Sequence, residues 1–136
     1  MKAQKQTKIK YFFVYGTLKI GGRFAKGFDE LRKSSTAATV SGFDLHNLGA
    51  FPGVVHGTGQ LHGEVHEYSE HEKVLASMDR IEGYDGTLNS LFVREVIDVV
   101  VDDKTVQAYI YVFNSSHRLP KSTLVETGRW NIGGNN

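Results

Sequence analysis

The sequence of 136 residues contains no cysteine. Disulfide frameworks, thiolate zinc sites and a cysteine nucleophile are therefore excluded. Proline is also scarce, with two residues against 15 glycines, a balance more typical of strands and turns than of a helical bundle. Because 40% of the residues are hydrophobic, the chain is long enough and apolar enough to bury the core of one domain.

Long apolar runs and a strong net charge are missing too. No run approaches the length of a transmembrane helix, and a formal net charge of +1 gives no field that favours nucleic acid or an anionic membrane as a partner. Lysines crowd residues 1–10 without an apolar stretch behind them, so this segment does not resemble a signal peptide. We expect a cytoplasmic protein, monomeric or weakly homodimeric, with a disordered basic leader at 1–8, one domain at 9–130 and a flexible tail at 131–136.

The most continuous apolar run ends in a glycine turn. Its residues, from Ile9 to Tyr15, predict a central strand that is covered on both faces. The strand leads into Gly16 and then into the pair Gly21-Gly22. Consecutive backbone N–H groups at such a junction can converge on one point. The turn is therefore a candidate site for an anion or a carbonyl oxygen.

The remaining pattern alternates strands with turns. We expect a short helix or loop over 23–33, strands over 36–45, 54–55, 59–68, 92–101 and 106–113, and a helical turn near 122–126. Asp102-Asp103-Lys104 reads as the turn of a hairpin between the last two strands. With no repeat or linker, the predicted fold is one α+β domain with a mixed or largely antiparallel sheet.

One helix is predicted from Glu70 to Glu82. Ser69 and Glu72 have the spacing of a capping box, and Gly83 supplies the stop. At about 100° per residue, an apolar stripe forms along one side. Its members are Val74, Leu75, Met78 and Ile81.

The helix also places a carboxylate near this apolar stripe. Glu82 lies within roughly 50° of the centre of the stripe, whereas Asp79 lies on its flank. Partial burial and the negative end of the helix dipole both raise the pKa of Glu82, which suits a general acid–base. The structural alternatives are that Glu82 pairs with an arginine such as Arg94 or reaches solvent.

Several motifs, in matching order and spacing, resemble the gamma-glutamylcyclotransferase-like superfamily, which includes the gamma-glutamylamine cyclotransferases. The likeness spans about residues 11–113. The motifs are Val14-Tyr15-Gly16-Thr17-Leu18-Lys19, Leu61-His62-Gly63-Glu64-Val65-His66-Glu67-Tyr68, Met78-Asp79-Arg80-Ile81-Glu82-Gly83-Tyr84, Phe92-Val93-Arg94 and Tyr111-Val112-Phe113.

The resemblance implies a small mixed or antiparallel β-barrel flanked by short helices, with a pocket at its edge. It implies that the Tyr15–Leu18 loop, with Gly16 and Thr17, binds a gamma-glutamyl moiety and that Glu82 is the catalytic residue. The family reaction closes 5-oxoproline by attack of the substrate's own α-amine, without metal, cofactor or enzyme nucleophile. A small-molecule substrate is thus the expected partner.

Three further side chains are candidates for substrate binding. Tyr84 and Tyr111 can form hydrogen-bonding walls, as can Tyr15, although each is equally a candidate for a packed aromatic. Arg94 can clamp substrate, although a strand-face or ion-pair role is more common for such a residue. Two departures from the family pattern, Phe92 in place of tyrosine and a longer connection at 84–91, leave the substrate open.

The sequence also offers candidates for other functions. His62, Glu64 and His66 share one face of a strand and could hold a metal, although a polar face open to solvent is the commoner reason for this pattern. The glycines at 16, 21 and 22 lack the remaining residues of a phosphate-binding P-loop. The main alternative is a non-catalytic binding or regulatory protein of the same fold. The intact loop and Glu82 together favour an enzyme.

Overall fold

The computed structural model describes residues 9–49, 51–87, 89–114 and 124–131. Five strands form one sheet in the order β2-β3-β1-β5-β4. The strands are β1 (Tyr11–Val14), β2 (Arg32–Asn47), β3 (Pro52–Tyr68), β4 (Phe92–Val101) and β5 (Lys104–Phe113), and the helices are the 3-10 helix η1 (Ala25–Leu31) and α1 (His71–Glu82). The predicted leader and most of the predicted tail lie outside the described residues.

β1 is the central strand, as its apolar run predicts. It pairs antiparallel with β3 and parallel with β5. Phe13 joins a core built almost entirely from strand residues. Phe12 and Val14, on the opposite face, join a second core that includes residues of both helices. The strand is shorter than the predicted Ile9–Tyr15, but both of its faces are buried.

The β2–β3 hairpin corrects the predicted strand pattern. β3 is one continuous strand, whereas the sequence pattern predicts separate strands at 54–55 and 59–68. The glycines at 57 and 59 make room for Asp44, which accepts a hydrogen bond from the Gly59 N–H at 2.9 Å. A register shift beside Gly42, where φ is 95°, bends the partner strand β2.

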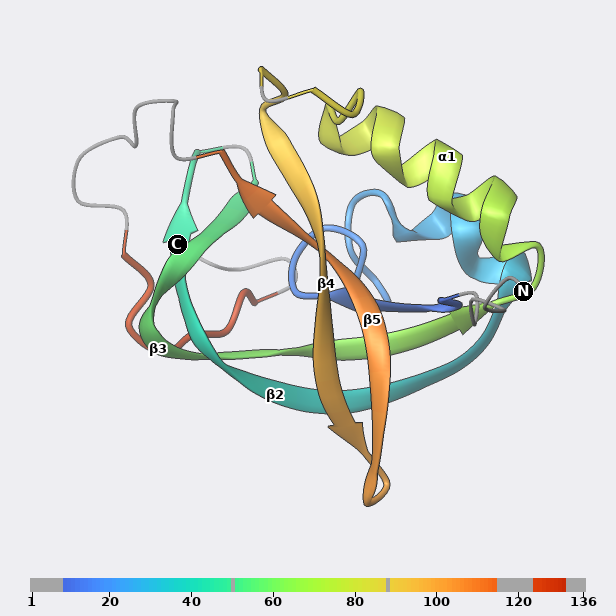
Figure 1. The fold of residues 1–136 in the computed structure, drawn as a ribbon, viewed down its shortest axis with the longest axis horizontal. Helices are drawn as coiled ribbons and strands as arrows, with labels where there is room; N and C mark the ends of the chain where they lie inside the picture. Colours follow the sequence, from blue (N-terminus) through green and yellow to red (C-terminus); the bar gives the residue numbers. More distant parts are fainter. Residues whose placement is uncertain (1–8, 50, 88, 115–123, 132–136) are drawn as a thin grey trace, which may run out of the picture.

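The sheet is strongly curled but open. β2 and β4 are the two ends of the strand order and contact each other, but no ladder joins them within the described residues. Figure 1 shows the β4–β5 hairpin crossing the long β2–β3 hairpin. The predicted α+β class and mixed sheet are therefore confirmed, while "barrel" describes the curl only loosely.

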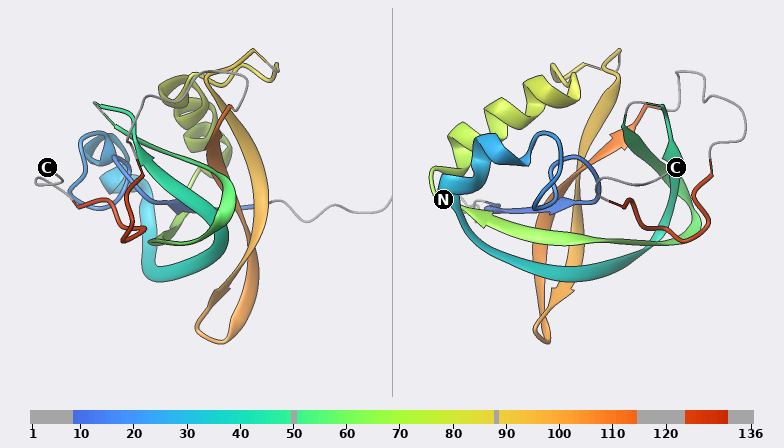
Figure 2. Two further views of the ribbon diagram at one scale, coloured as in Figure 1. Left: turned by 90° about the vertical axis from the view of Figure 1, so that its left-hand side faces the viewer. Right: turned by 180° about the vertical axis from the view of Figure 1, so that it is seen from behind.

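Both helices cover the same side of the molecule (Figures 1 and 2). Gly83, with φ 71°, ends α1 as predicted. The predicted capping box is wrong: Glu70 is the N-cap in a left-handed conformation, and the Ser69 hydroxyl bonds instead to the carbonyl of Leu31 at 3.3 Å. The Ser69 N–H bonds to that same carbonyl, so the end of β3 is tied to the end of η1. In the described part of the chain, neither helix is long and apolar enough to cross a membrane.

The C-terminal half follows the sequence closely. β4 has the predicted limits, and Asp102 and Asp103 form the hairpin turn with φ of 51° and 65°. β5 begins at Lys104, two residues before the predicted start. The part of the predicted turn at 122–126 that is described is not helical, because Leu124 forms an isolated bridge with His46.

Candidate active site

A cavity of about 190 Å³ lies between the loop after β1, the end of α1 and the start of β4. The structure brings six of the eight predicted site residues into its wall. They are Tyr15, Gly16, Thr17, Leu18, Glu82 and Tyr111. Tyr84 and Arg94, the other two, do not line it. The two halves expected from the sequence, a glycine loop and a carboxylate, therefore face one space.

The loop after β1 is folded back tightly on itself. The Lys19 N–H bonds to the Gly16 carbonyl at 3.0 Å, and the Phe24 N–H bonds to the Thr17 carbonyl at 2.9 Å. A Cβ at Gly16 would overlap the ring of Pro52, and one at Gly22 would overlap the backbone of Thr17. Glycine is required at both positions because of this close approach.

This turn leaves a row of backbone donors unpaired. Within the described residues, the N–H groups of Gly16, Thr17 and Leu18 make no hydrogen bond to another backbone group or to a side chain, although Gly16 and Leu18 are buried. Buried N–H groups are almost always paired. Gly16 and Leu18 are thus two exceptions, and together with Thr17 they line one cavity, so this stretch of backbone is suited to bind an anion or a carbonyl oxygen.

A side chain of β3 and a backbone carbonyl of the C-terminal segment fix the far end of the loop. The Glu64 carboxylate accepts hydrogen bonds from the Ile20 N–H at 3.0 Å and from His66 Nε2 at 2.8 Å. Although burial opposes ionisation, these two bonds and nearby positive charge hold the pKa of Glu64 below its usual value. Lys19 donates to the Trp130 carbonyl at 2.7 Å. The loop is therefore tied at two consecutive residues.

The same contacts bear on the metal site considered from the sequence. His66 is fully buried rather than open to solvent, and its Nδ1 bonds to the Tyr68 hydroxyl at 2.7 Å. His62 bonds to the hydroxyl of Thr39 at 2.9 Å. Across the described ranges, no group of three or more His, Cys, Asp or Glu side chains is arranged to hold a metal ion. His66 and Glu64 serve to support the loop.

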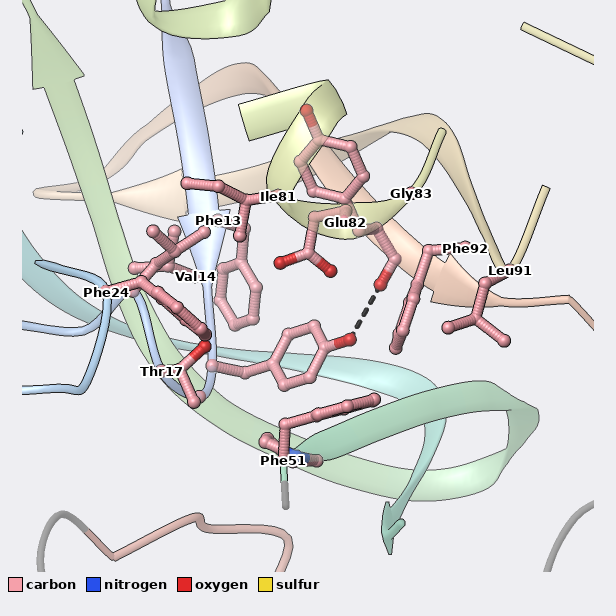
Figure 3. A pocket seen from close by; sticks show the side chains of 15 residues that line it. Phe13, Val14, Thr17, Phe24, Phe51, Ile81, Glu82, Gly83, Leu91 and Phe92 are labelled. Atoms are coloured by element: carbon pink, nitrogen blue, oxygen red, sulfur yellow. Dashed lines mark hydrogen bonds between the residues drawn. The ribbon is translucent and has the colours of Figure 1, made fainter. Parts of the chain in front are cut away.

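Glu82 occupies the last position of α1, and its carboxylate points into the cavity with Phe13 on one side and Phe92 on the other (Figure 3). Burial raises the pKa of Glu82 to about 7. The direction agrees with the sequence prediction, and burial is its physical cause. In the part of the chain that the structure describes, no donor is hydrogen-bonded to this carboxylate, so it is available to a ligand.

Arg94 has the ion-pair role that was the alternative to a substrate clamp, but its partner is Asp79 rather than Glu82. Its Nη1 donates to the Asp79 carboxylate at 2.5 Å. The guanidinium also lies 5.2 Å from the ring centre of Tyr84 and 5.0 Å from that of Tyr109. Arg94 thus fixes the end of α1 to β4 and β5 from outside the cavity.

Tyr111 links this ion pair to the cavity wall. Its hydroxyl donates to the second oxygen of Asp79 at 2.6 Å, and its carbonyl accepts from the Tyr15 hydroxyl at 2.7 Å (dashed line in Figure 3). Burial and then the Asp79 carboxylate raise the pKa of Tyr111, and burial also raises that of Tyr15. Both hydroxyls are neutral and committed within the protein, so the two rings act mainly as walls.

Two groups of residues were not anticipated from the sequence. Asp79, one turn before Glu82, holds the helix end; the only sequence signal was its place in the motif 78–84. The apolar walls Phe24, Phe51 and Leu91 stand outside or at the ends of regular elements. No hydrophobic periodicity marks such positions.

The arrangement can combine two chemical tasks. A carboxyl with a pKa near neutrality can accept a proton and later return it. The N–H groups across the cavity can stabilise negative charge that develops on a carbonyl oxygen. An acyl-transfer reaction with proton transfers uses both.

Comparison with known proteins agrees with this geometry. The family model described as gamma-glutamyl cyclotransferase, AIG2-like, matches residues 12–132. A Vibrio cholerae protein provisionally named a gamma-glutamylcyclotransferase is 31% identical over 118 residues, which cover 87% of this chain and 92% of the relative. A Citrobacter rodentium gamma-glutamylcyclotransferase family protein, ytfP, is 29% identical over 68% of this chain and 70% of its own.

The crystal structure of a mouse AIG2-like protein superposes with a TM-score of 0.72, covering 95% of this chain and 92% of the mouse chain. At 23% identity this likeness shows the fold alone. The family match and the Vibrio relative cover most of the chain. The protein therefore belongs to the gamma-glutamyl cyclotransferase, AIG2-like family.

Proposed function

We propose that the protein is a cyclotransferase that converts a gamma-glutamyl amine or gamma-glutamyl amino acid into 5-oxoproline and a free amine. The observation that carries this proposal is the Glu82 carboxyl, with its pKa raised to about 7, in a cavity that is also lined by Gly16, Thr17 and Leu18, whose N–H groups have no hydrogen-bond partner among the described residues. The family match supports cyclotransferase chemistry. The roles given below to single residues are part of the proposal.

The reaction needs one carboxylate acting twice. The substrate's α-ammonium gives a proton to Glu82, and the resulting amine attacks the γ-carbonyl carbon of the same molecule. A new C–N bond closes the five-membered ring, and the original amide C–N bond breaks. Glu82 returns the proton to the departing nitrogen, and the second proton that the attacking nitrogen loses on ring closure goes to the released amine, which leaves as an ammonium ion. All product atoms come from the substrate, and the tethered nucleophile chiefly needs to be held in an attacking conformation.

The loop supplies the electrostatic part. In the proposal, the Gly16, Thr17 and Leu18 N–H groups bind the charged and carbonyl oxygens of the glutamyl moiety and stabilise the oxyanion formed during attack. Tyr15 and Tyr111 confine the ring as it closes. Tyr84 and Arg94, which do not line the cavity, are no longer assigned to substrate but to the support of Asp79.

The test is release of 5-oxoproline from gamma-glutamyl compounds by the purified protein and by Glu82→Gln. The variant should keep its circular dichroism spectrum and lose activity by roughly 10²-fold or more, as expected for loss of a general acid–base. Glu30→Gln, which changes an exposed carboxylate on η1, is the matched control and should retain activity. Full activity of Glu82→Gln would overturn the mechanism. Binding of these compounds by the wild-type protein without release would instead favour the non-catalytic alternative.

A further inference from the structure

The mouth of the cavity is formed by exposed apolar side chains. Phe24, Ile81 and Leu91 are 37%, 41% and 38% exposed, and all three line it. They come from three separate segments of the chain and surround the same opening (Figure 3). Exposed apolar side chains gathered around one concavity are typical of a binding surface rather than of chance exposure.

The apolar surface continues inwards from this mouth. Phe51 and Phe92 line the cavity, with ring centres 6.0 Å apart. The polar groups of the lining are the backbone of the loop and Glu82, and Phe92 lies beside the Glu82 carboxylate (Figure 3). A gamma-glutamyl compound must place its α-amine next to Glu82, so its charged glutamyl half lies against the loop and Glu82. The departing half then extends along the aromatic walls.

No cation among the described residues lines the cavity. Of the cations close in sequence to lining residues, Lys19 donates to the Trp130 carbonyl and Arg94 pairs with Asp79. Arg80 is exposed and donates to the Ser77 hydroxyl at 3.3 Å. Arg23 stacks on Phe24 at 5.2 Å on the exposed rim without lining the cavity. A carboxylate on the departing half would be desolvated against aromatic walls without a paired charge, which is unfavourable.

We propose that the leaving group is an apolar primary amine that carries an aromatic or branched alkyl group and no carboxylate. This inference rests on the function proposed above. Phe24, Phe51 and Leu91 form the subsite of this amine and determine specificity. Gamma-glutamyl derivatives of amino acids, and those with a charged distal end, are poorer substrates. The enzyme then acts downstream of a reaction class that joins the γ-carboxyl of glutamate to hydrophobic amines.

Four matched substrates test this proposal through kcat/KM for 5-oxoproline release. They are gamma-glutamyl-phenethylamine, gamma-glutamyl-ethylamine, gamma-glutamyl-phenylalanine and gamma-glutamyl-ε-lysine. The phenethylamine compound differs from the ethylamine compound by the phenyl group and from the phenylalanine compound by the carboxylate. Its kcat/KM should exceed that of each of the other three by roughly tenfold or more, the scale on which apolar pockets discriminate between substrates. Equal values, or a lead for a carboxylate-bearing compound, would overturn the inference alone; no release from any of the four would overturn the proposed function and the inference with it.

Rim variants locate the effect. Leu91→Ala should reduce the ratio of kcat/KM for gamma-glutamyl-phenethylamine to kcat/KM for gamma-glutamyl-ethylamine about fivefold. Val96→Ala, which changes an exposed valine on β4 that does not line the cavity, should leave this ratio unchanged. Leu91→Lys should raise kcat/KM for gamma-glutamyl-phenylalanine relative to that for gamma-glutamyl-phenethylamine, because the lysine supplies a cation for the carboxylate. An unchanged ratio in both Leu91 variants would remove Leu91 from the subsite. A lead for gamma-glutamyl-phenylalanine that Arg23→Ala abolishes would overturn the claim that the leaving group lacks a carboxylate.

Discussion

Glu82 places an ionisable carboxyl in a buried position, which destabilises its charged form but suits a general acid–base. Its carboxyl would ionise near pH 4.5 if unperturbed, and burial raises its pKa to about 7. The sequence revealed this residue because helical periodicity places it beside the apolar stripe of α1. Periodicity could not show that its carboxylate would face a cavity, or that no donor among the described residues would be hydrogen-bonded to it.

The raised pKa predicts that Glu82→Gln stabilises the fold at alkaline pH. Between about pH 4.5 and 7 the folded state binds the proton more tightly than the unfolded state, so stability falls as pH rises through this range. Above pH 7 the wild-type protein therefore carries a cost on the order of 1–3 kcal/mol. Urea unfolding at pH 8 should show Glu82→Gln more stable by about this amount, with no difference below pH 4.5. A variant less stable than wild type at pH 8 would contradict the burial of this charge.

Gly16 is predicted to be irreplaceable for a steric reason. An alanine Cβ would overlap Pro52, whose ring cannot turn away. We expect Gly16→Ala to cost about 1–3 kcal/mol by the usual scale of overpacking and to impair activity by moving the donor loop. Gly27→Ala on η1 is the control, because its Cβ meets no atom within 4 Å. Urea denaturation should show that its free energy of unfolding is equal to that of the wild type or slightly higher. Equal behaviour of the two variants would show that the contact with Pro52 is unimportant.

The end of α1 is held by two partly buried contacts of Asp79 as well as by its packing stripe. Asp79 binds Arg94 and Tyr111, one turn before Glu82. Asp79→Asn keeps the shape of the side chain but removes its charge, so we expect it to lower kcat about tenfold while leaving the pH dependence of kcat/KM in place. Arg80→Ala, at an exposed neighbour on the same helix, is the control. If Asp79→Asn has wild-type kcat, the ion pair does not position Glu82.

The donor loop depends on β3 in a corresponding way. Glu64→Ala removes the acceptor of the Ile20 N–H and the partner of His66. Because the loop is proposed to bind the glutamyl moiety, KM should rise about tenfold, with a smaller change in kcat. Glu67→Ala is the comparison, because Glu67 lies on the same strand as Glu64 but forms its ion pairs with Lys10 and Lys33. A change confined to kcat would contradict a role in binding.

Sequence reasoning succeeded for elements with a strong local pattern. β4 has the predicted limits because most of its residues are valine, isoleucine or phenylalanine and it lies between turn signals. Gly83 ends α1 as predicted. Sequence reasoning failed where a distant residue decides the local structure. Asp44 accounts for the glycines of β3, and Leu31 takes the Ser69 hydroxyl from the expected helix cap. The Asp79–Arg94 pair joins residues fifteen apart and has no local signature.

In the molecule as a whole, the two cores meet at the cavity. Phe13 and Tyr15 belong to the core inside the curled sheet, whereas Val14 and Leu18 belong to the core under the helices. The loop that follows β1 is thus anchored from both sides, and the end of α1 faces it. The resemblance in sequence motifs led to the correct family and fold class. It could not indicate the apolar mouth, because Phe24 and Leu91 lie outside those motifs.

The pH dependence of kcat/KM, measured by 5-oxoproline release from gamma-glutamyl-phenethylamine, tests the central claim most directly. If Glu82 with its pKa of about 7 is the base, kcat/KM should fall about tenfold for each pH unit below 7. The substrate's own ammonium should govern only the alkaline side. A profile that stays flat from pH 7 down to pH 5 would contradict the assignment of Glu82 as the group that accepts the proton.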